Sequence, residues 1–419
     1  MKAGFFIAFR YLLGRAGEGG RYLQGAATGI ALSLIPIIVT LIVADGMIRG
    51  ITDRHLELGT GHLQTFNLAS PGDLQNIAPA LMEEEAVRGV WAERRGLGII
   101  IGGRGKTGAT VRAVDPSFWE DKGSGKYLTT IAGEARIQSD REVLLGEALA
   151  DSIGAEVGKN IRLMTMGSAE DGRNIPKTTV FKVRGIISSG YREIDALWCI
   201  MSYEAGKAIL PPKTSSSYLI LKIADPYRNA DATARYLNYI LGPRYAVYTW
   251  QELQPSLYDS YESTRQLLLL IMALIVLVAA VNVSSATSML ALERRRDIAV
   301  LKTAGASPGA TSRIFLWGSC LTGLTGAIVG IGVGLLIGKS INPLIHGLEA
   351  VLGFFSRLFN GGEVKILDPG FYLETIPIVI DWTTVFFIGF FTVLCSVIAS
   401  WIPARQAGKV KPIEILRKY

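Results

Sequence analysis

Four long stretches without a charged residue constrain this chain more than any other feature of its sequence. They cover residues 22–44, 266–292, 314–338 and 382–404. Each exceeds the roughly 20 residues that an apolar helix needs to cross the ~30 Å hydrocarbon layer of a bilayer. A helix also satisfies its backbone hydrogen bonds internally, as lipid requires. The sequence therefore predicts four transmembrane helices, with a large polar segment between the first two.

Basic residues gather beside one end of each predicted helix. Segments 1–21, 291–313 and 403–419 contain 14 Lys and Arg against 4 Asp and Glu, a net charge of +10. The rest of the chain contains 29 Lys and Arg against 32 Asp and Glu, a net charge of −3. Loops rich in Lys and Arg stay in the cytoplasm, so both termini are predicted to be cytoplasmic in a multi-pass protein of the inner membrane. This placement explains the overall charge of +7 without a nucleic-acid partner.

The start of the chain predicts a retained membrane anchor. Phe5, Phe9, Leu12 and Leu13 share one helical face, which is typical of a helix lying on the membrane surface. The apolar stretch that follows is 23 residues long, more than the 7–15 of a cleaved signal peptide, and no small-x-small cleavage site follows it.

These observations divide the chain into nine parts. They are a cytoplasmic interfacial helix (1–21), transmembrane helix 1 (22–48), a periplasmic domain (49–264), transmembrane helix 2 (265–292), a cytoplasmic loop (293–313), transmembrane helix 3 (314–338), a periplasmic loop (339–381), transmembrane helix 4 (382–404) and a cytoplasmic tail (405–419).

Short β-like and helical runs alternate in the predicted outer domain. Residues 45–58 continue the first transmembrane helix outward, and Gly98–Ile101 and Ala109–Val114 flank a turn, which predicts a hairpin. Further strands are expected at 142–145, 160–166, 180–188, 196–201, 218–223 and 245–250, with helices at 147–153 and 229–241. The predicted fold class is an α+β membrane protein, with a large mixed α/β extracytoplasmic domain inserted between transmembrane helices 1 and 2.

Cysteine and histidine give no metal-ligand or disulfide spacing. They are Cys199, Cys320, Cys395, His55, His62 and His346. The separation of His55 and His62 fits a surface or interface role better than metal binding. No metal site is predicted, and the outer domain is expected to depend on its core rather than on disulfides.

The loop after the second apolar stretch is the sharpest local motif. It reads Glu293-Arg-Arg-Arg-Asp-Ile-Ala-Val-Leu-Lys-Thr-Ala-Gly305. Ile298 and Leu301 share one helical face, Gly305 suits a helix C-cap, and Ser307-Pro308 suits the start of the next helix. The motif predicts a short amphipathic helix, which either seats in a groove of a cytoplasmic partner or is an ordinary basic loop between two transmembrane helices.

Several segments resemble the lipoprotein-releasing permeases (the LolC/LolE type) of the MacB/FtsX superfamily of ABC transporters. The resemblance rests on residues 268–285 and 293–308, the tail 403–417, the opening 6–12, and the runs 144–154 and 371–377. It follows the chain in order over nearly its whole length. The layout of one transmembrane helix, a large outer domain and three more transmembrane helices is also that of the family.

The resemblance implies that residues 293–306 form a coupling helix that docks on a separate ATPase subunit. The residues that take this role are Glu293, Arg294, Asp297, Ile298, Leu301, Lys302 and Gly305. The chain itself has no complete P-loop, since the first glycine position before Gly338-Lys339-Ser340 holds Val333. We therefore expect a non-catalytic permease subunit without a cofactor of its own, with ATP and Mg²⁺ bound by the partner ATPase.

The resemblance also implies sites for the substrate and a carrier. An apolar cavity for acyl chains lies in this family between the first and second transmembrane helices of two paired permeases. The matching residues are Ile38, Ile42, Met47, Leu268, Met272 and Ile275, each with plain lipid or helix contact as the alternative. The segment 166–177 shares the Ile175-Pro176 pair of a carrier-binding hook but is short, so a simple hairpin tip is the other interpretation.

Two rows of small residues predict close helix packing. Gly326, Gly330, Gly334 and Gly338 recur every four residues in the third stretch, and Gly25, Gly29 and Ser33 form a similar row in the first. Small residues let two helix backbones approach closely in a membrane.

The preferred hypothesis is a permease subunit that releases lipoproteins from the inner membrane, driven by ATP hydrolysis on a separate subunit. Its expected partners are an ABC ATPase, a second permease that is identical or related, the lipoprotein substrate, a periplasmic lipoprotein carrier and the bilayer. Two alternatives stay open at this point. One is a MacB-like efflux permease for hydrophobic compounds or peptides, and the other is an FtsX-like signal transmitter that activates a cell-wall hydrolase without transport.

Overall fold

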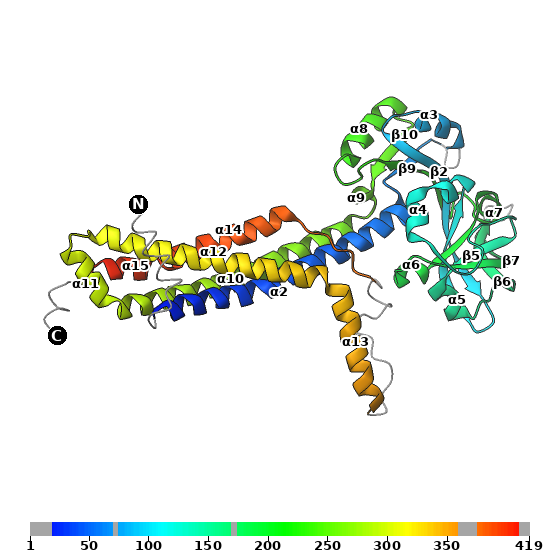
Figure 1. The fold of residues 1–419 in the computed structure, drawn as a ribbon. Helices are drawn as coiled ribbons and strands as arrows, with labels where there is room; N and C mark the ends of the chain where they lie inside the picture. The colour runs from blue at the N-terminus through cyan, green and yellow to red at the C-terminus, as the bar shows by residue number, and fades with distance from the viewer. Residues whose placement is uncertain (1–18, 70–73, 169–173, 359–374, 410–419) are drawn as a thin grey trace. The chain divides into compact units, whose positions relative to one another are not determined.

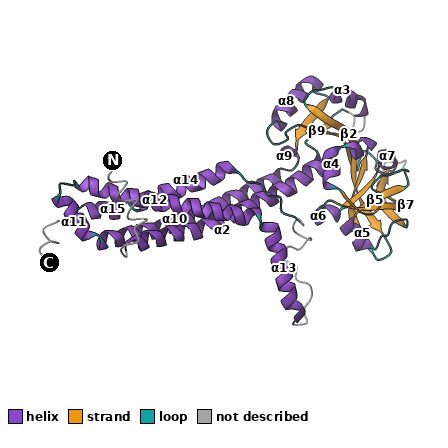
Figure 2. Cartoon of the chain, viewed as in Figure 1, coloured by secondary structure: helices purple, strands orange, loops and turns teal. Residues whose placement is uncertain are grey.

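The computed structural model describes residues 19–69, 74–168, 174–358 and 375–409. The predicted interfacial helix thus lies outside the described residues, apart from its last three, as do the end of the tail and residues 359–374. Two compact units form: a helical unit (Met1–Gly46, Tyr261–Gly362 and Ile376–Tyr419) and a sheet unit (Met47–Ser260 and Glu363–Thr375). Figures 1 and 2 show the helices and the sheet.

The helical unit is built from four long apolar helices. They are α2 (Gly19–Arg54), α10 (Pro255–Glu293), α12 (Pro308–Lys339) and α14 (Trp382–Ala399), which continues as α15 (Trp401–Gly408). Among the described residues these four are long and apolar enough to cross a membrane. The short α11 (Arg295–Thr303) joins α10 to α12. The break between α14 and α15 has a local cause, because Pro403 cannot donate a hydrogen bond to the carbonyl of Ala399.

The segment 339–381, expected to be a loop, contains an 18-residue helix, α13 (Ile341–Leu358). The sequence interpretation missed it because it searched for long uncharged stretches. Glu349 interrupts this one, and its apolar residues occupy one side of the helix rather than the whole of it.

Ten strands of the sheet unit form one mixed sheet in the described part of the chain, in the order β10-β1-β9-β2-β3-β8-β5-β7-β4, with β6 paired to β2 and β7. The strands are β1 (Leu63–Asn67), β2 (Val87–Ile101), β3 (Lys106–Val114), β4 (Thr129–Gly133), β5 (Glu142–Gly146), β6 (Asn160–Ser168), β7 (Asn174–Ser188), β8 (Trp198–Ser202), β9 (Ser215–Ile223) and β10 (Tyr245–Thr249). The pairs β3–β8 and β5–β7 are parallel, and the other pairs are antiparallel. The predicted mixed sheet is confirmed.

Short helices cover this sheet. They are α3 (Ala78–Met82), α4 (Lys122–Tyr127), α5 (Glu147–Ile153), α6 (Arg192–Asp195), α7 (Tyr203–Ile209), α8 (Ala230–Leu241) and α9 (Trp250–Leu253). A π-helical turn, His55–Thr60, joins α2 to β1. The expected helices at 147–153 and 229–241 are confirmed by α5 and α8.

The long strand β2 changes its partner along its length. Val87–Gly96 pairs with β9, whereas Gly98–Ile101 pairs with β6. Side chains crowd both glycines: a Cβ on Gly96 or Gly98 would lie 2.8 Å from a methyl group of Leu210 or Leu163, respectively. Leu210 and Leu163 belong to one apolar core, and the absence of side chains at the two glycines lets that core pack closely against β2.

A buried ionic cluster lies in the middle of the sheet. Both oxygens of Glu93 accept hydrogen bonds from Arg112, at 2.9 and 2.8 Å, and Arg95 donates to the same carboxylate at 2.7 Å. Tyr218 adds a hydroxyl donor at 3.3 Å. Glu93 and Arg112 have no exposed surface, so the central pair of this cluster is closed off from solvent.

Candidate functional site

The helix α11 forms one end of the helical bundle, here called the α11 end. Gly305 has a φ of +94°, a conformation that glycine adopts without strain. The N–H groups of Gly305 and Ala306 donate to the carbonyls of Lys302 and Leu301, each at 3.0 Å, which completes a C-terminal cap. Ser307 then begins α12, its hydroxyl accepting from the Ala310 N–H. The predicted short helix with this cap and this restart is confirmed.

One face of α11 is buried against the bundle. Ile298 is 1% exposed and Ala299 is fully buried. Ile298 belongs to a cluster with Leu23, Leu290, Ala291, Phe315, Ala404 and Ala407. Ile298, predicted as a docking side chain, therefore holds α11 against its own bundle, and a partner would meet the opposite face.

Charged side chains secure the two ends of α11. Arg294 and Asp297 pair at 3.1 Å in the first turn. In the last turn, the Nζ of Lys302 donates to the carbonyl of Gly408 at 2.5 Å, at the end of α15. The first contact is local to α11, whereas the second ties the end of α11 to α15.

The exposed face of α11 differs from the face predicted by sequence. Of the residues predicted to contact the ATPase, Glu293 and Gly305 are exposed and Leu301 is half-buried. The structure adds Arg295, Arg296 and Val300, whose side chain is 55% exposed. Position 300 could have been found from the helical period, because it lies about 200° from Ile298 around the helix.

The predicted glycine row in α12 is a close packing seam with α2. A Cβ on Gly330 would lie 2.8 Å from the Cβ of Leu34, and one on Gly334 would lie 2.8 Å from the Cβ of Ile38. The contacts advance in the same direction along both helices, so α2 and α12 run parallel. The second predicted row is wrong as a seam within the described chain, because nothing lies within 4 Å of a Cβ on Gly25 or Gly29.

The predicted cavity residues fall into two groups. Ile38, Ile42 and Met272 belong to the buried core of the bundle, and the glycine seam accommodates the side chains of Ile38 and Ile42. Leu268 is partly buried, Ile275 is exposed, and Met47 lies in the sheet unit. The exposed apolar surface of α10 is instead formed by Leu267, Leu270, Ile271, Leu274, Ile275, Leu277, Val278 and Val281.

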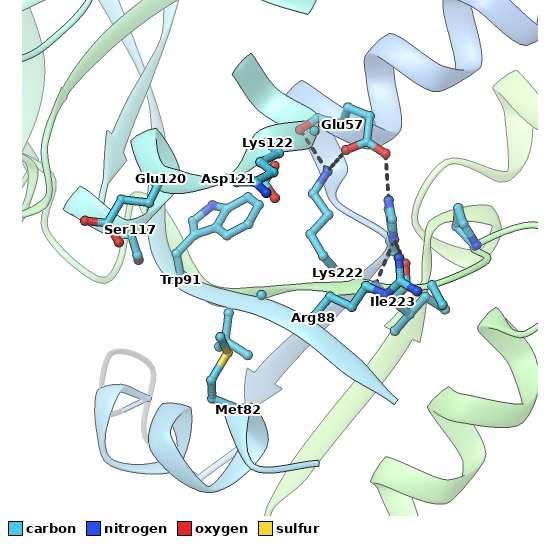
Figure 3. A pocket seen from close by; sticks show the side chains of 16 residues that line it. Glu57, Met82, Arg88, Trp91, Ser117, Glu120, Asp121, Lys122, Lys222 and Ile223 are labelled. Atoms are coloured by element: carbon cyan, nitrogen blue, oxygen red, sulfur yellow. Dashed lines mark hydrogen bonds and ion pairs between the residues drawn. The ribbon is translucent and has the colours of Figure 1, made fainter. Parts of the chain in front are cut away.

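Within the sheet unit, a charged junction holds the turn where α2 ends (Figure 3). The Nζ of Lys222, on β9, donates to the carbonyls of Leu56 and Glu57 at 3.2 and 3.0 Å and to the Glu57 carboxylate at 2.5 Å. The other oxygen of that carboxylate lies 3.0 Å from the Nε2 of His62. Burial lowers the pKa of Lys222 and the negative charge of Glu57 opposes this shift. Three donor–acceptor contacts from one ammonium thus fix the π-helical turn after α2 to the sheet.

These side chains border an open pocket of about 590 Å³, which Trp91, Met82 and Ile223 also line. Its acidic side chains, Glu57, Glu120 and Asp121, are matched by Arg88, Lys122 and Lys222. Such a balanced lining does not select a ligand of one charge. Among the described residues, no group of three or more His, Cys, Asp and Glu side chains is placed to hold a metal ion.

The predicted hook lies at the far end of the β6–β7 hairpin. Ile175 pairs with Gly167 and Pro176 with Met166, and the side chains of Ile175 and Met166 are exposed. Residues 169–173, between the two strands, lie outside the described residues. Carrier binding at Ile175 and Pro176 stays a prediction.

The chain matches two protein families and is similar to several known transmembrane proteins over nearly its whole length. The FtsX-like permease C-terminal family matches residues 269–412, and the MacB-like periplasmic core domain family matches residues 25–238. The lipoprotein-releasing system transmembrane protein LolC of Neisseria meningitidis is 24% identical over 98% of both chains. LolC of Xylella fastidiosa (strain 9a5c) is 27% identical over 98% of both chains, and LolE of Haemophilus influenzae is 22% identical over 100% of both.

The two family matches correspond largely to the two compact units of the structure. One runs from residue 25 in α2 through the sheet unit to residue 238 in α8, and the other runs from residue 269 in α10 through α15 and includes the candidate coupling helix. A non-catalytic subunit of this kind works with a separate ATPase. The chain belongs to the FtsX-like permeases of ABC transporters that carry a MacB-like periplasmic core domain.

Proposed function

We propose that this permease releases lipoproteins from the inner membrane, using ATP hydrolysis by a partner subunit that binds ATP and Mg²⁺. One observation carries the proposal: relatives named for lipoprotein release are collinear with the chain over 98% or more of both lengths. The same order of one apolar helix, a sheet unit and three apolar helices runs through that whole match.

In the proposed orientation, the α11 end faces the cytoplasm. The excess of basic residues in segments 1–21, 291–313 and 403–419 supports this orientation. The sheet unit then lies in the periplasm and both termini in the cytoplasm. The exposed Arg295, Arg296 and Val300 would meet the ATPase.

The contacts of the bundle supply a path for force. Movement of α11 displaces α12 through the Ile298 cluster and α15 through the Lys302–Gly408 contact. Movement of α12 would displace α2 through the glycine seam, because the two backbones approach closely there. The helix α2 continues into the sheet unit, where Lys222 fixes the π-helical turn that follows it.

For the substrate, we propose the exposed apolar side of α10 in place of the buried Ile38 and Ile42. One chain leaves this side uncovered, and a second permease, identical or related, facing it would enclose a space for acyl chains. The most exposed of the described side chains on this side are Val278, Val281 and Leu267. Acyl chains require only apolar surface, which the exposed side chains from Leu267 to Val281 supply.

The function is tested with the permease and its ATPase reconstituted in proteoliposomes that hold a triacylated lipoprotein. We expect ATP-dependent release of the acylated form and no release with an ATPase variant that lacks its P-loop lysine. The matched substrate is the same protein without its acylated cysteine, which should not stimulate ATP hydrolysis. Stimulation only by small hydrophobic compounds would favour the efflux alternative instead, and activation of a wall hydrolase without transport would favour the signalling alternative.

The coupling role of α11 is tested with Val300→Asp, since this side chain is exposed and its replacement leaves the Ile298 cluster intact. We expect loss of ATPase binding in a pull-down of the complex, and Val300→Thr, of the same shape, should retain binding. Leu301→Asp, at the half-buried neighbour, should also weaken association. Normal assembly and transport by Val300→Asp would contradict docking through this face.

A further inference from the structure

The helix α13 leaves a row of large apolar side chains exposed. At 100° per residue, Leu344, Leu348, Val351 and Leu352 fall on one side, whereas Asn342, His346 and Glu349 fall on the other. The four apolar side chains are 50%, 52%, 52% and 39% exposed. A row of this length in contact with water is unfavourable, so the side must be covered by something other than the described parts of this chain.

The start of α13 lies at the opposite end of the bundle from α11. Only Ser340 separates it from α12, whose last residues lie beside the end of the seam, where Gly338 faces Ile42. Close to this level Arg265 joins Asp381, at 3.0 Å, to Asp45, at 3.4 Å. Charged side chains avoid the hydrocarbon layer, so this cluster marks the level of the bilayer surface. The exposed Trp382 at the start of α14 agrees, because Trp gathers at that surface.

Within the helical unit, α13 turns away from α12 and runs across the direction of the four long helices, as Figure 1 shows in orange. Its first turn is tied on the polar side. The Nδ2 of Asn342 donates to the carbonyl of Ile376 at 3.0 Å, and the N–H of Ile376 donates back to the Asn342 side chain at 3.1 Å. These two bonds connect the polar side of α13 to the segment that leads into α14. The apolar side of α13 takes no part in this connection.

We propose that α13 lies in the plane of the membrane and inserts its apolar side into the lipid leaflet at this end of the bundle. Lipid is the occupant because α13 begins at the end of the bundle where the neighbouring membrane-spanning helices also expose apolar side chains: Leu336, in the last turn of α12, and Phe386, in the first turns of α14. A helix that starts at the bilayer surface, crosses the spanning direction and has a polar and an apolar side fits that interface. The inference does not depend on the cargo.

The test uses the full-length chain in vesicles of phosphatidylethanolamine and phosphatidylglycerol, with its three native cysteines replaced by alanine. A nitroxide spin label is attached at Leu348→Cys or, as the matched control on the other side of the helix, at Ala350→Cys. Ile328→Cys, exposed on α12, provides a lipid reference, and Tyr239→Cys, exposed on α8, provides a water reference. Collision of each label with oxygen and with a water-soluble nickel chelate is then measured.

We expect the oxygen-to-nickel collision ratio at position 348 to approach that of position 328 and to exceed the ratio at position 350 several-fold. Equal, water-like ratios at 348 and 350 would overturn the proposal. An immobilised label at 348 with spin–spin broadening would also overturn it, because it would show a second copy of the chain on this face. The reference positions report whether each preparation is folded and inserted.

Discussion

At the scale of single residues, the balance of burial and charge is clearest at Glu93. Burial alone would raise the pKa of this carboxyl group, but the guanidinium groups of Arg112 and Arg95 outweigh burial and hold the pKa at about 2. The ring of Trp198 also lies 4.3 Å from the guanidinium carbon of Arg112. The cluster is thus stable only while all its charged members are present.

Replacing Glu93 should therefore destabilise the sheet unit. In Glu93→Gln, Arg112 stays buried without a negative partner, and breaking a buried pair in this way costs about 3–5 kcal/mol. We expect a lower melting temperature for the full-length protein in detergent, followed by tryptophan fluorescence. Glu156→Gln is the control, since Glu156 pairs with Lys159 at the surface and its loss should leave the melting temperature unchanged.

The same carboxyl group makes stability depend on pH. Its folded pKa of about 2 lies below the ordinary 4.5, so the unfolded chain binds a proton at a higher pH than the folded chain does. Its contribution to stability is complete above about pH 4.5 and is lost as the pH falls towards 2. Melting curves between these values should show a smaller pH dependence for Glu93→Gln than for the unmodified protein. Identical slopes would mean that another group controls acid unfolding.

At the scale of elements, local sequence signals predicted the ends of helices better than their contacts. The Gly305 cap and the Ser307-Pro308 start were predicted correctly because a cap depends on a few adjacent residues. The direction in which Ile298 points was not predicted correctly, because an apolar side chain on a short helix is equally suited to packing on its own bundle or on a partner. Strands β1 and β4 were missed, since their side chains do not alternate clearly between apolar and polar.

The seam between α2 and α12 allows a sharp comparison of two glycines. In Gly330→Ala the added methyl group would lie 2.8–2.9 Å from Leu34 and Ala31, so the helices must separate. Overpacking of this kind costs about 1–3 kcal/mol. Gly332→Ala, two residues away, meets nothing within 4 Å and should be neutral or stabilising. Thermal unfolding of the two variants in detergent measures the difference, and equal melting temperatures would refute a tight seam.

At the scale of the whole molecule, the chain consists of two compact units with separate apolar cores. Proteins built from several units commonly unfold in more than one transition. We expect calorimetry of the full-length protein to resolve two transitions. Glu93→Gln should lower only the transition of the sheet unit, and Gly330→Ala only that of the helical unit. A single transition shifted by both variants would show that the units unfold together.

The sequence by itself determined the number of membrane-spanning helices, the inserted mixed sheet and the position of α11. These follow from long uncharged stretches, alternating patterns and caps, which are properties of residues adjacent in the chain. Only the tertiary structure decided that Ile38 and Ile42 fill the α12 seam, that Ile298 faces inward and Val300 outward, and that α13 presents an apolar side. An apolar side chain carries no sign of what will cover it, because hydrophobic burial is non-directional and depends on which elements meet in space.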